Sequence, residues 1–430
     1  MNEDAAVSVE IPRAVGVDQR SRYNTMRLVM AAIFVISALV AAMTLPGDTA
    51  GGWGMFLTTL LFLQGITQFG VAFTAIMRLS GGFWARPLFR LAEVTTLVFM
   101  PISFVGILLV YFGARHQLFF WIDPAPGEHL SAWLGEGKLL FRALASQVVF
   151  YVVAFLYVRI SLRPDIDQRA VAEATGLRRM VLALFGGAGG TADPEALTHR
   201  LYFWSVPVLI IAGLANTLIS LDFAMMLWPH YHSTVFTMYY MIGCMFGGTA
   251  LLLLLAGLQR RYINIDTVFS TRQIKNLGII FTGFMCLWLY FFWAQFFVTW
   301  FGNLPNELRP LNAQMEGHYG PVFWTSVACL FMLPLAFLIF ARVKRSLVLA
   351  SMVALLICTG VWLNRYLMVL PAQWEAHVPF STVGGAAGTI ALVSGFLLLL
   401  LLAFDAFPML SRWEVERIAP EKRASWHSSH

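Results

Sequence analysis

Apolar residues form long continuous runs along the chain, without the alternation of half-buried strands or the one-sided pattern of surface helices. A helix that crosses a lipid bilayer needs about 20 mostly apolar residues, and the chain contains ten runs of about this length. They lie near residues 26–45, 53–77, 91–113, 139–160, 201–226, 233–258, 277–300, 321–342, 346–370 and 386–409. The pattern predicts an all-α integral membrane protein with about ten transmembrane helices.

Composition supports this prediction and narrows the chemistry. Apolar residues make up 59% of the chain and charged residues 12%, far from the usage of water-soluble domains. The four cysteines lie in four different predicted spans without a CxxC motif, so we expect no iron–sulfur cluster and no covalently bound haem in this chain. The histidines lie in or beside loops and tails, so no span offers a mid-membrane imidazole pair for haem b. No metal site and no catalytic residues are predicted.

The distribution of Lys and Arg predicts the orientation, because these residues are retained on the cytoplasmic side of a membrane. All but five of the 29 lie in the N-terminal tail, the loops from even- to odd-numbered spans, or the C-terminal tail. The exceptions are Arg115, Lys138 and Arg309 in the opposite loops and Arg142 and Arg365 inside spans. We expect cytoplasmic tails at 1–25 and 410–430 around a transmembrane domain at 26–409, with an uncleaved first span. The basic balance then indicates contact with anionic lipid headgroups, and no nucleic-acid binding.

The longest connection between spans, about 161–200, has two parts. Residues 167–185 have the pattern of an amphipathic surface helix, and GGAGGTADPE at 186–195 is typical of a flexible linker. The glycines are not predicted to bind phosphate, because no GKS or GKT follows them.

Charged residues inside or beside the spans are the first candidates for a functional site, because burying charge in a bilayer is costly. Asp222, Arg142 and Arg365 lie at similar depth near the outward ends of three spans. Asp222 is also near a helix C-terminus, where the helix dipole disfavours a carboxylate, so we expect it to be protonated, hydrated or paired with one of the arginines. Glu93 and Asp405 flank cytoplasmic helix ends, where side chains reach water at little cost, and structural roles are favoured for them.

The connection between the fifth and sixth spans gathers six polar or helix-breaking candidates, Asp222, Pro229, His230, His232, Ser233 and Thr234. Pro229 is expected to end the fifth span, and Ser233 or Thr234 to cap the sixth. The aromatic residues Trp228, Tyr231, Tyr239 and Tyr240 suit a membrane-interface belt. A capped hairpin does not explain Asp222 or the two histidines. A structural ion pair of Asp222 and an outward-facing proton path through Asp222, His230 and His232 both remain open.

Four segments resemble, in order, the ActF-type membrane subunit of bacterial alternative complex III, which belongs to the NrfD and polysulfide-reductase superfamily. LD at 221–222 and MMLWPHYHSTVF at 225–236 are similar to its FDWLMSLDPHWFSTIFG signature. FFWAQFFVTWFGNLPNE at 291–307 resembles FSQYLLIWYANLPEE, and the matched residues are Gln295, Trp300, Asn303, Leu304, Pro305 and Glu307. FMLPLAFLIFARVKRS at 331–346 resembles FVLPFLLLLSRRVKR, and NRYLMVLPA at 364–372, with Tyr366 and Pro371, resembles DLYWLVMPA. The first five spans match in layout only.

The resemblance implies a fold and a setting. The fold is two four-helix bundles, at about 53–226 and 233–370, with the first and tenth helices outside them. Gly243 with Gly247 and Gly384 with Gly388 are GxxxG pairs that suit close helix contact. The setting is the bacterial inner membrane, in a quinol:cytochrome c oxidoreductase with a multihaem cytochrome c, an iron–sulfur subunit and a second NrfD-like subunit. The implied role is a scaffold and candidate proton path without a redox cofactor, next to the quinone pool.

Departures from the family pattern favour the scaffold. Trp228, Leu330 and Asn364 stand where the family usually has Asp, His and Asp, and proton transfer needs exchangeable groups within hydrogen-bond reach. Two alternatives remain. One is a quinol-binding NrfD-like anchor subunit, which would need a quinone pocket near a cluster-bearing partner. The other is a secondary transporter, which usually has helices broken near the membrane centre, whereas the strong polar breaks here lie at span ends.

Overall fold

The computed structural model describes residues 19–123, 131, 133–166, 171–172, 176–186, 193–228, 230–262, 269–373, 376–411 and 413–414. Ten helical stretches among these residues are long and apolar enough to cross a membrane, and each overlaps one of the ten predicted runs. The predicted class, a multi-pass all-helical membrane protein, is therefore confirmed. Helices dominate because a backbone in lipid must satisfy its hydrogen bonds within the segment.

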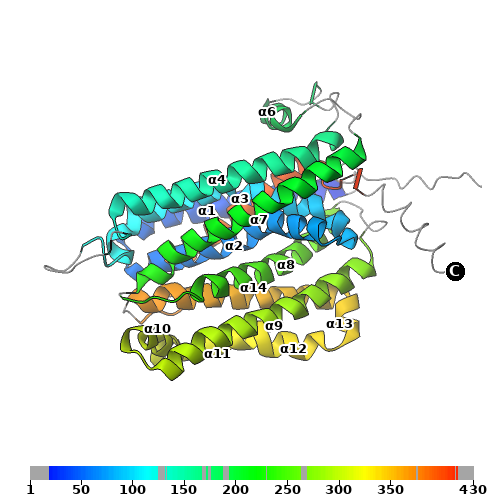
Figure 1. Cartoon of the computed structure of the whole chain (residues 1–430). Helices are drawn as coiled ribbons and strands as arrows, with labels where there is room; N and C mark the ends of the chain where they lie inside the picture. The colour runs from blue at the N-terminus through cyan, green and yellow to red at the C-terminus, as the bar shows by residue number, and fades with distance from the viewer. Residues whose placement is uncertain are drawn as a thin grey trace, which may run out of the picture.

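The long helical stretches run side by side across Figure 1. Nine of them contain the helices α1 (Arg20–Thr44), α2 (Ala50–Leu79), α3 (Arg86–Leu118), α4 (Glu136–Leu162), α7 (Pro194–Phe223), α8 (Phe236–Tyr262), α9 (Thr271–Gly302), α14 (Leu347–Val369) and α15 (Val383–Ala406). The remaining stretch, eighth in chain order, joins α11 (Gly320–Val327), a π-helical turn (Ala328–Met332) and α12 (Leu333–Leu338). Three shorter helices lie near the ends of the spans, α6 (Gly176–Phe185), α10 (Pro305–Met315) and α13 (Ala341–Arg345).

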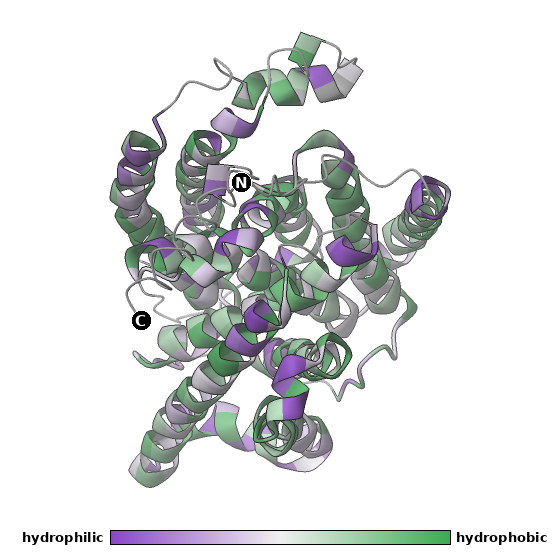
Figure 2. Ribbon diagram, turned by 90° about the vertical axis from the view of Figure 1, so that its right-hand side faces the viewer, coloured by the Kyte–Doolittle hydropathy of each residue, from purple (hydrophilic) through white to green (hydrophobic). Residues whose placement is uncertain are grey.

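The two ends of the helix assembly differ in composition. We call the end with α10 and the connections 230–235 and 376–382 the histidine face, because His230, His232, His318 and His377 lie there. The opposite end, with α6 and α13, is the arginine face (Figure 1). Figure 2 looks onto the arginine face and shows hydrophobic colouring along most helices, with hydrophilic segments mainly near their ends.

Polar caps extend two helices beyond their apolar runs. α7 begins at Pro194, because Asp193 accepts a hydrogen bond from the backbone N–H of Glu195 at 3.0 Å. α9 begins at Thr271 behind a capping box, in which Ser270 and Gln273 satisfy each other's backbone groups. Such caps supply partners for the free N–H groups of a first helical turn. Hydropathy alone therefore places both helix starts several residues too late.

The eighth stretch shows how a proline is accommodated within a span. Pro334 has no N–H, and its ring would clash with a carbonyl one turn earlier in a regular helix. The backbone widens into the π-helical turn Ala328–Met332 just before it. Leu330 in this turn packs against α14, where a Cβ on Gly360 would lie 2.7 Å from Leu330 Cγ.

α2 lies at the centre of the assembly, because 83% of the residues in its apolar segment are buried. α1 is peripheral, with 17% of its apolar segment buried. α2 packs against α3, α7, α8, α14 and α15, and α1 packs mainly against α15. Glycines allow the closest approaches. A Cβ on Gly385 of α15 would lie 3.1 Å from the Cα of Gly52 of α2, and one on Gly388 would lie 2.8 Å from the Phe56 ring. The Gly384–Gly388 pair thus lies at a close helix contact.

Candidate functional site

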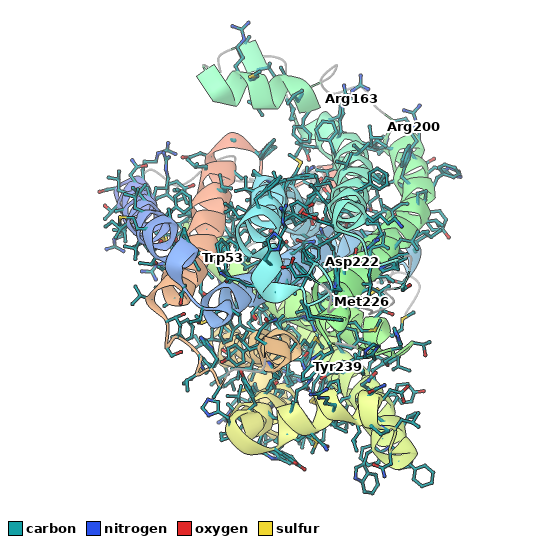
Figure 3. The ribbon with its side chains drawn as sticks, turned by 90° about the vertical axis from the view of Figure 1, so that its left-hand side faces the viewer. Trp53, Arg163, Arg200, Asp222, Met226 and Tyr239 are labelled. Carbon is teal, nitrogen blue, oxygen red and sulfur yellow. The ribbon has the colours of Figure 1, made fainter. Side chains whose placement is uncertain are left out.

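Asp222, in the last turn of α7, forms a bidentate ion pair with Arg142 of α4 on the histidine face. Arg142 donates from Nη2 to Oδ1 at 2.8 Å and from Nε to Oδ2 at 3.0 Å. Trp133 donates its indole N–H to Oδ1 at 3.0 Å, and its ring lies 4.2 Å from the Arg142 guanidinium. Asp222 is buried, and Figure 3, viewed from the histidine face, places it within the α3, α4 and α7 half of the molecule.

This geometry explains how a carboxylate is tolerated at a helix C-terminus. Three donors and one positive charge offset the unfavourable helix dipole. Because both oxygens of Asp222 accept hydrogen bonds, the pair ties the end of α7 to the start of α4.

The two histidines of the candidate proton path are exposed on the connection 230–235. His230 adopts a left-handed backbone conformation, with φ of 58°, which turns the chain sharply between α7 and α8. The hydrogen bonds that the structure gives Asp222 come from Arg142 and Trp133. Pro229, predicted to end the fifth span, lies outside the described residues, and α7 already ends at Phe223.

The similar depth of Asp222 and Arg365 in the predicted spans suggests that they could pair, but the structure gives Arg365 other partners. It is fully buried, and no carboxylate within the described residues pairs with it. Its Nη2 donates to the carbonyl oxygen of Tyr240 at 2.6 Å, its Nη1 to Asn364 Oδ1 at 3.2 Å, and its guanidinium lies 3.7 Å from the centre of the Tyr240 ring. Neutral acceptors and a cation–π contact therefore hold this charge.

Gly243 provides the space for that charge. A Cβ at Gly243 would lie 2.7 Å from Arg365 Nη2, whereas one at Gly247 would meet Ile66 and Val361. Both glycines of this GxxxG pair therefore lie at close contacts with neighbouring helices. The space beside Gly243 holds the Arg365 guanidinium between α8 and α14.

Residues from separate segments meet at a pocket between α8, α9, α10 and α14. The pocket is small, with a cavity volume of about 30 Å³, and opens on the histidine face. Its lining includes Tyr231, Phe236, Tyr239, Gln295, Phe296, Thr299, Glu307, Pro310, Leu311, Gln314 and Met368. Gln295 donates to Tyr231 Oη at 2.6 Å and accepts from Ser233 Oγ at 2.7 Å. Ser233 therefore links two segments instead of capping α8.

The pocket wall has aromatic and amide character. Tyr239 accepts a hydrogen bond from Asn364 Nδ2 at 2.6 Å, so the buried Arg365 lies behind this wall. Burial raises the pKa of the Tyr231 phenol to about 12, and the nearby Glu307 carboxylate adds to this shift. The hydroxyl of Tyr231 thus stays protonated and can donate a hydrogen bond across the physiological pH range.

The aromatic residues of the connection point inward. Trp228, Tyr231, Tyr239 and Tyr240 are all buried within the protein, so the membrane-interface belt predicted for them is wrong. The spacing of these residues fits both a lipid-facing belt and a cluster buried within the protein. The packing of the neighbouring helices decides between the two. Tyr239, for example, contacts the rings of Trp288 and Phe292 on α9.

The other residues matched to the family pattern have local roles. Asn303 ends α9 in a left-handed conformation with φ of 49°, and Pro305 occupies the first turn of α10. Tyr366 donates to the carbonyl oxygen of His377 at 2.8 Å. Pro371 is buried in the short helix Leu370–Gln373, whereas Thr234 and Trp300 are exposed.

Glu93 belongs to a buried charge cluster beneath the arginine face, and the expectation that it reaches water is wrong. It pairs with Arg78 at 2.9 Å and Arg90 at 3.5 Å. Arg90 also contacts Asp165 at 2.6 Å, and Arg78 contacts Glu414 at 3.0 Å. Opposite charges in this cluster compensate one another, as buried ions require. Glu414 follows the last span and joins α2 to the chain's C-terminal part.

Asp405 pairs with Arg20 at 2.7 Å and also with Arg27. It is partly exposed, and the pair connects α1 to α15 at the arginine face. This is a structural position of the kind expected for a charge at a helix end.

A buried polar chain lies inside the half of the molecule that contains Asp222. Gln68 of α2 donates to Gln147 of α4 at 2.5 Å and accepts from Asn216 of α7 at 3.1 Å. Ser103 of α3 donates to Gln64 of α2 at 3.3 Å. Four helices thus contribute polar side chains to one interior, and these groups are amides and hydroxyls.

No family model and no curated protein sequence matches the chain. Among the described residues, no three His, Cys, Asp or Glu side chains are placed to hold a metal ion together. The class supported by fold and site is a multi-pass helical membrane protein with paired charges at both ends of one half of the assembly.

Proposed function

We propose that the chain is a non-catalytic membrane subunit of a respiratory quinol:cytochrome c oxidoreductase of the alternative complex III type. The observation that carries the proposal is the meeting of segments that resemble the ActF-type subunit. Ser233, Gln295 and Glu307, from two of these segments, gather at one pocket, and Met368 from a third also lines it. Such convergence of distant segments supports a shared fold.

The proposed arrangement is two four-helix bundles with two peripheral helices. In support, α2, α3, α4 and α7 share the interior polar chain, and α8 packs against both α9 and α14. The proposed location is the bacterial inner membrane with both termini cytoplasmic, so the arginine face would be cytoplasmic.

The proposed role is mainly a scaffold. Asp222 is held by three donors, and the polar chain behind it contains amides, which do not exchange protons readily near neutral pH. Proton conduction would require ordered water between these groups. The chain is proposed to carry no redox cofactor, whereas haem c and iron–sulfur clusters belong to a multihaem cytochrome and an iron–sulfur partner, beside a second NrfD-like subunit.

A second candidate function is quinol binding in this chain. The lining of the pocket favours it, since pockets for small molecules are mostly apolar with a few fixed polar groups, and Tyr231, Gln295 and Glu307 supply these. The cavity volume of about 30 Å³ means that lining side chains would have to move to admit a quinol ring. Binding there is compatible with a scaffold and does not by itself provide electron transfer.

Purification of the tagged full chain from its native membrane tests the assignment. We expect a multihaem cytochrome c and an iron–sulfur protein to co-purify with it in fixed ratio. Recovery of the chain without any haem- or cluster-bearing partner would contradict the proposed complex.

Substitutions at the ion pair separate scaffold from proton path. Asp222→Asn should weaken assembly, because it leaves Arg142 without its carboxylate, a loss of about 3 to 5 kcal/mol for a fully buried pair and less near an interface. His230→Ala combined with His232→Ala should leave quinol turnover per assembled complex unchanged. Normal assembly of Asp222→Asn with lost proton translocation would show a proton path instead.

A further inference from the structure

Helix α6 lies beside the arginine-face end of α4, outside the packed helices (Figures 1 and 2). Leu182 and Phe185 form its buried side. The Phe185 ring lies 4.9 Å from that of Phe155 on α4 and 5.3 Å from that of Phe407. Phe155 precedes the end of α4 by about two turns, or about 10 Å along the helix axis. The end of α6 therefore lies below the helix ends, at the depth expected for lipid headgroups and the first acyl carbons.

The other side of α6 exposes apolar side chains. Met180 and Leu184 are 71% and 57% exposed and lie one helical turn apart. Amphipathic helices at a bilayer surface insert such side chains into the boundary between headgroups and acyl chains. Exposure of the Met180 and Leu184 side chains to water would be unfavourable, whereas contact with acyl chains removes their apolar surface from water.

Four arginines surround this corner of the molecule. Arg159 and Arg163 lie at the end of α4, Arg179 on α6 and Arg200 on α7. Figure 3 shows Arg163 and Arg200 on neighbouring helices next to α6, and α4 packs against α7.

The structure describes no carboxylate partner for the arginines of this corner. All four arginines are exposed, and within the described residues none of them pairs with a carboxylate. Among the described residues, the nearby acid Asp165 pairs with Arg90. Asp193 and Glu195 lie at the N-terminus of α7, where the cap and the helix dipole use their charge. Buried arginines such as Arg90, in contrast, have carboxylate partners.

We propose that α6 and the arginine-face ends of α4 and α7 form a binding site for an anionic phospholipid. The exposed guanidinium groups of Arg163, Arg179 and Arg200 supply the positive charge that attracts the anionic headgroup, and planar donor pairs of this kind match phosphate oxygens. Met180 and Leu184 contact the acyl chains. The apolar contacts select a membrane lipid over a free phosphate ion. The site depends only on the chain spanning a membrane, so it stands apart from the proposed respiratory function.

The test measures lipid selectivity of the full chain in phosphatidylcholine nanodiscs that contain a small fraction of spin-labelled phosphatidylglycerol. The immobilised fraction of the label should be higher than for spin-labelled phosphatidylcholine. In the variant Arg163→Gln/Arg179→Gln/Arg200→Gln, affinity for the anionic lipid should fall by about fivefold for each arginine removed.

The matched control is Arg272→Gln/Arg342→Gln/Arg345→Gln, which removes three exposed arginines from the other half of the arginine face and should retain the selectivity. Equal losses in both variants would show only general surface charge and overturn the site. If the first variant fails to fold, competition on the unmodified chain decides the question. Release of the labelled lipid by inorganic phosphate at matched ionic strength would show a free-phosphate site and contradict the proposal.

Discussion

Arg365 shows at the residue scale how a charge can be buried without an opposite charge. A backbone carbonyl, an amide oxygen and an aromatic face surround the guanidinium, and each offsets part of its desolvation. Its position near the outward end of a span, at a depth similar to that of Asp222, suggests that carboxylate as a partner. The depth of a residue in the membrane does not show which neighbouring helix its side chain faces. Asp222 and Arg142 meet because α4 and α7 are neighbours, and that adjacency is a property of the fold.

Gly243→Ala tests the space around this charge. The added Cβ would lie 2.7 Å from Arg365 Nη2, so the guanidinium must move from the Tyr240 carbonyl. We expect a loss of about 1 to 3 kcal/mol in the free energy of unfolding, because a buried donor loses its partner. Gly213→Ala on α7 is the control, since a Cβ there meets nothing within 4 Å. Equal stability of the two variants in denaturant titrations would refute the packing explanation.

Tyr231 provides a prediction on pH. Its phenol has a pKa raised to about 12, mainly by burial, whereas an unfolded tyrosine ionises near pH 10. The stabilisation from the neutral phenol is therefore complete below about pH 10 and is lost as pH rises toward 12. The difference in tyrosinate absorbance between the unmodified chain and Tyr231→Phe should be absent at pH 10 and appear near pH 12. A difference that is already about half developed at pH 10 would show that the phenol is exposed to water.

Helix existence is predicted well by hydropathy at the element scale, and helix boundaries are not. The membrane requires long apolar runs, but the first turns of α7 and α9 are polar and are fixed by Asp193, Ser270 and Gln273. The buried aromatic residues near Tyr239 show the same limit. An aromatic side chain at the end of a span can face lipid or protein, and only the neighbours of the helix decide.

Ser270→Ala should shorten the start of α9. It removes a side chain that accepts from the Arg272 N–H and donates to Gln273, and loss of such a cap costs about 0.5 to 2 kcal/mol. Amide hydrogen exchange over residues 271–275 should speed up, while exchange in the middle of α9 should not change. Thr271→Ala, an exposed neighbouring change, serves as the comparison and should leave exchange as it is.

The arrangement of charge at the scale of the whole molecule predicts a topology that labelling can test. If the arginine face is cytoplasmic, cysteine introduced at position 131 should react with an impermeant reagent from outside, and cysteines at positions 170 and 425 should react only after the membrane is opened. Labelling at position 425 from outside would exclude cytoplasmic termini on both ends of ten spans.

The buried cluster beneath the arginine face makes a second prediction at this scale. Glu414→Gln removes one carboxylate from contact with Arg78 and Arg86, and breaking such a buried pair costs about 3 to 5 kcal/mol. The thermal unfolding temperature of the detergent-purified chain should fall clearly. Glu316→Gln, which changes an exposed carboxylate on the opposite face, should leave that temperature unaltered. If both variants unfold like the unmodified chain, the cluster does not contribute to stability.

The position of Glu414 has a consequence for biosynthesis. Trp413 donates to the Ser161 carbonyl, and Glu414 neutralises arginines of α2 and α3, yet both residues leave the ribosome after all ten spans. During translation, α2 and α3 are therefore in the membrane before the carboxylate that pairs with Arg78 and Arg86 has been synthesised. A chain truncated before residue 413 would keep every span and still lack this carboxylate, which would make it a substrate for the proteases that remove unassembled membrane proteins.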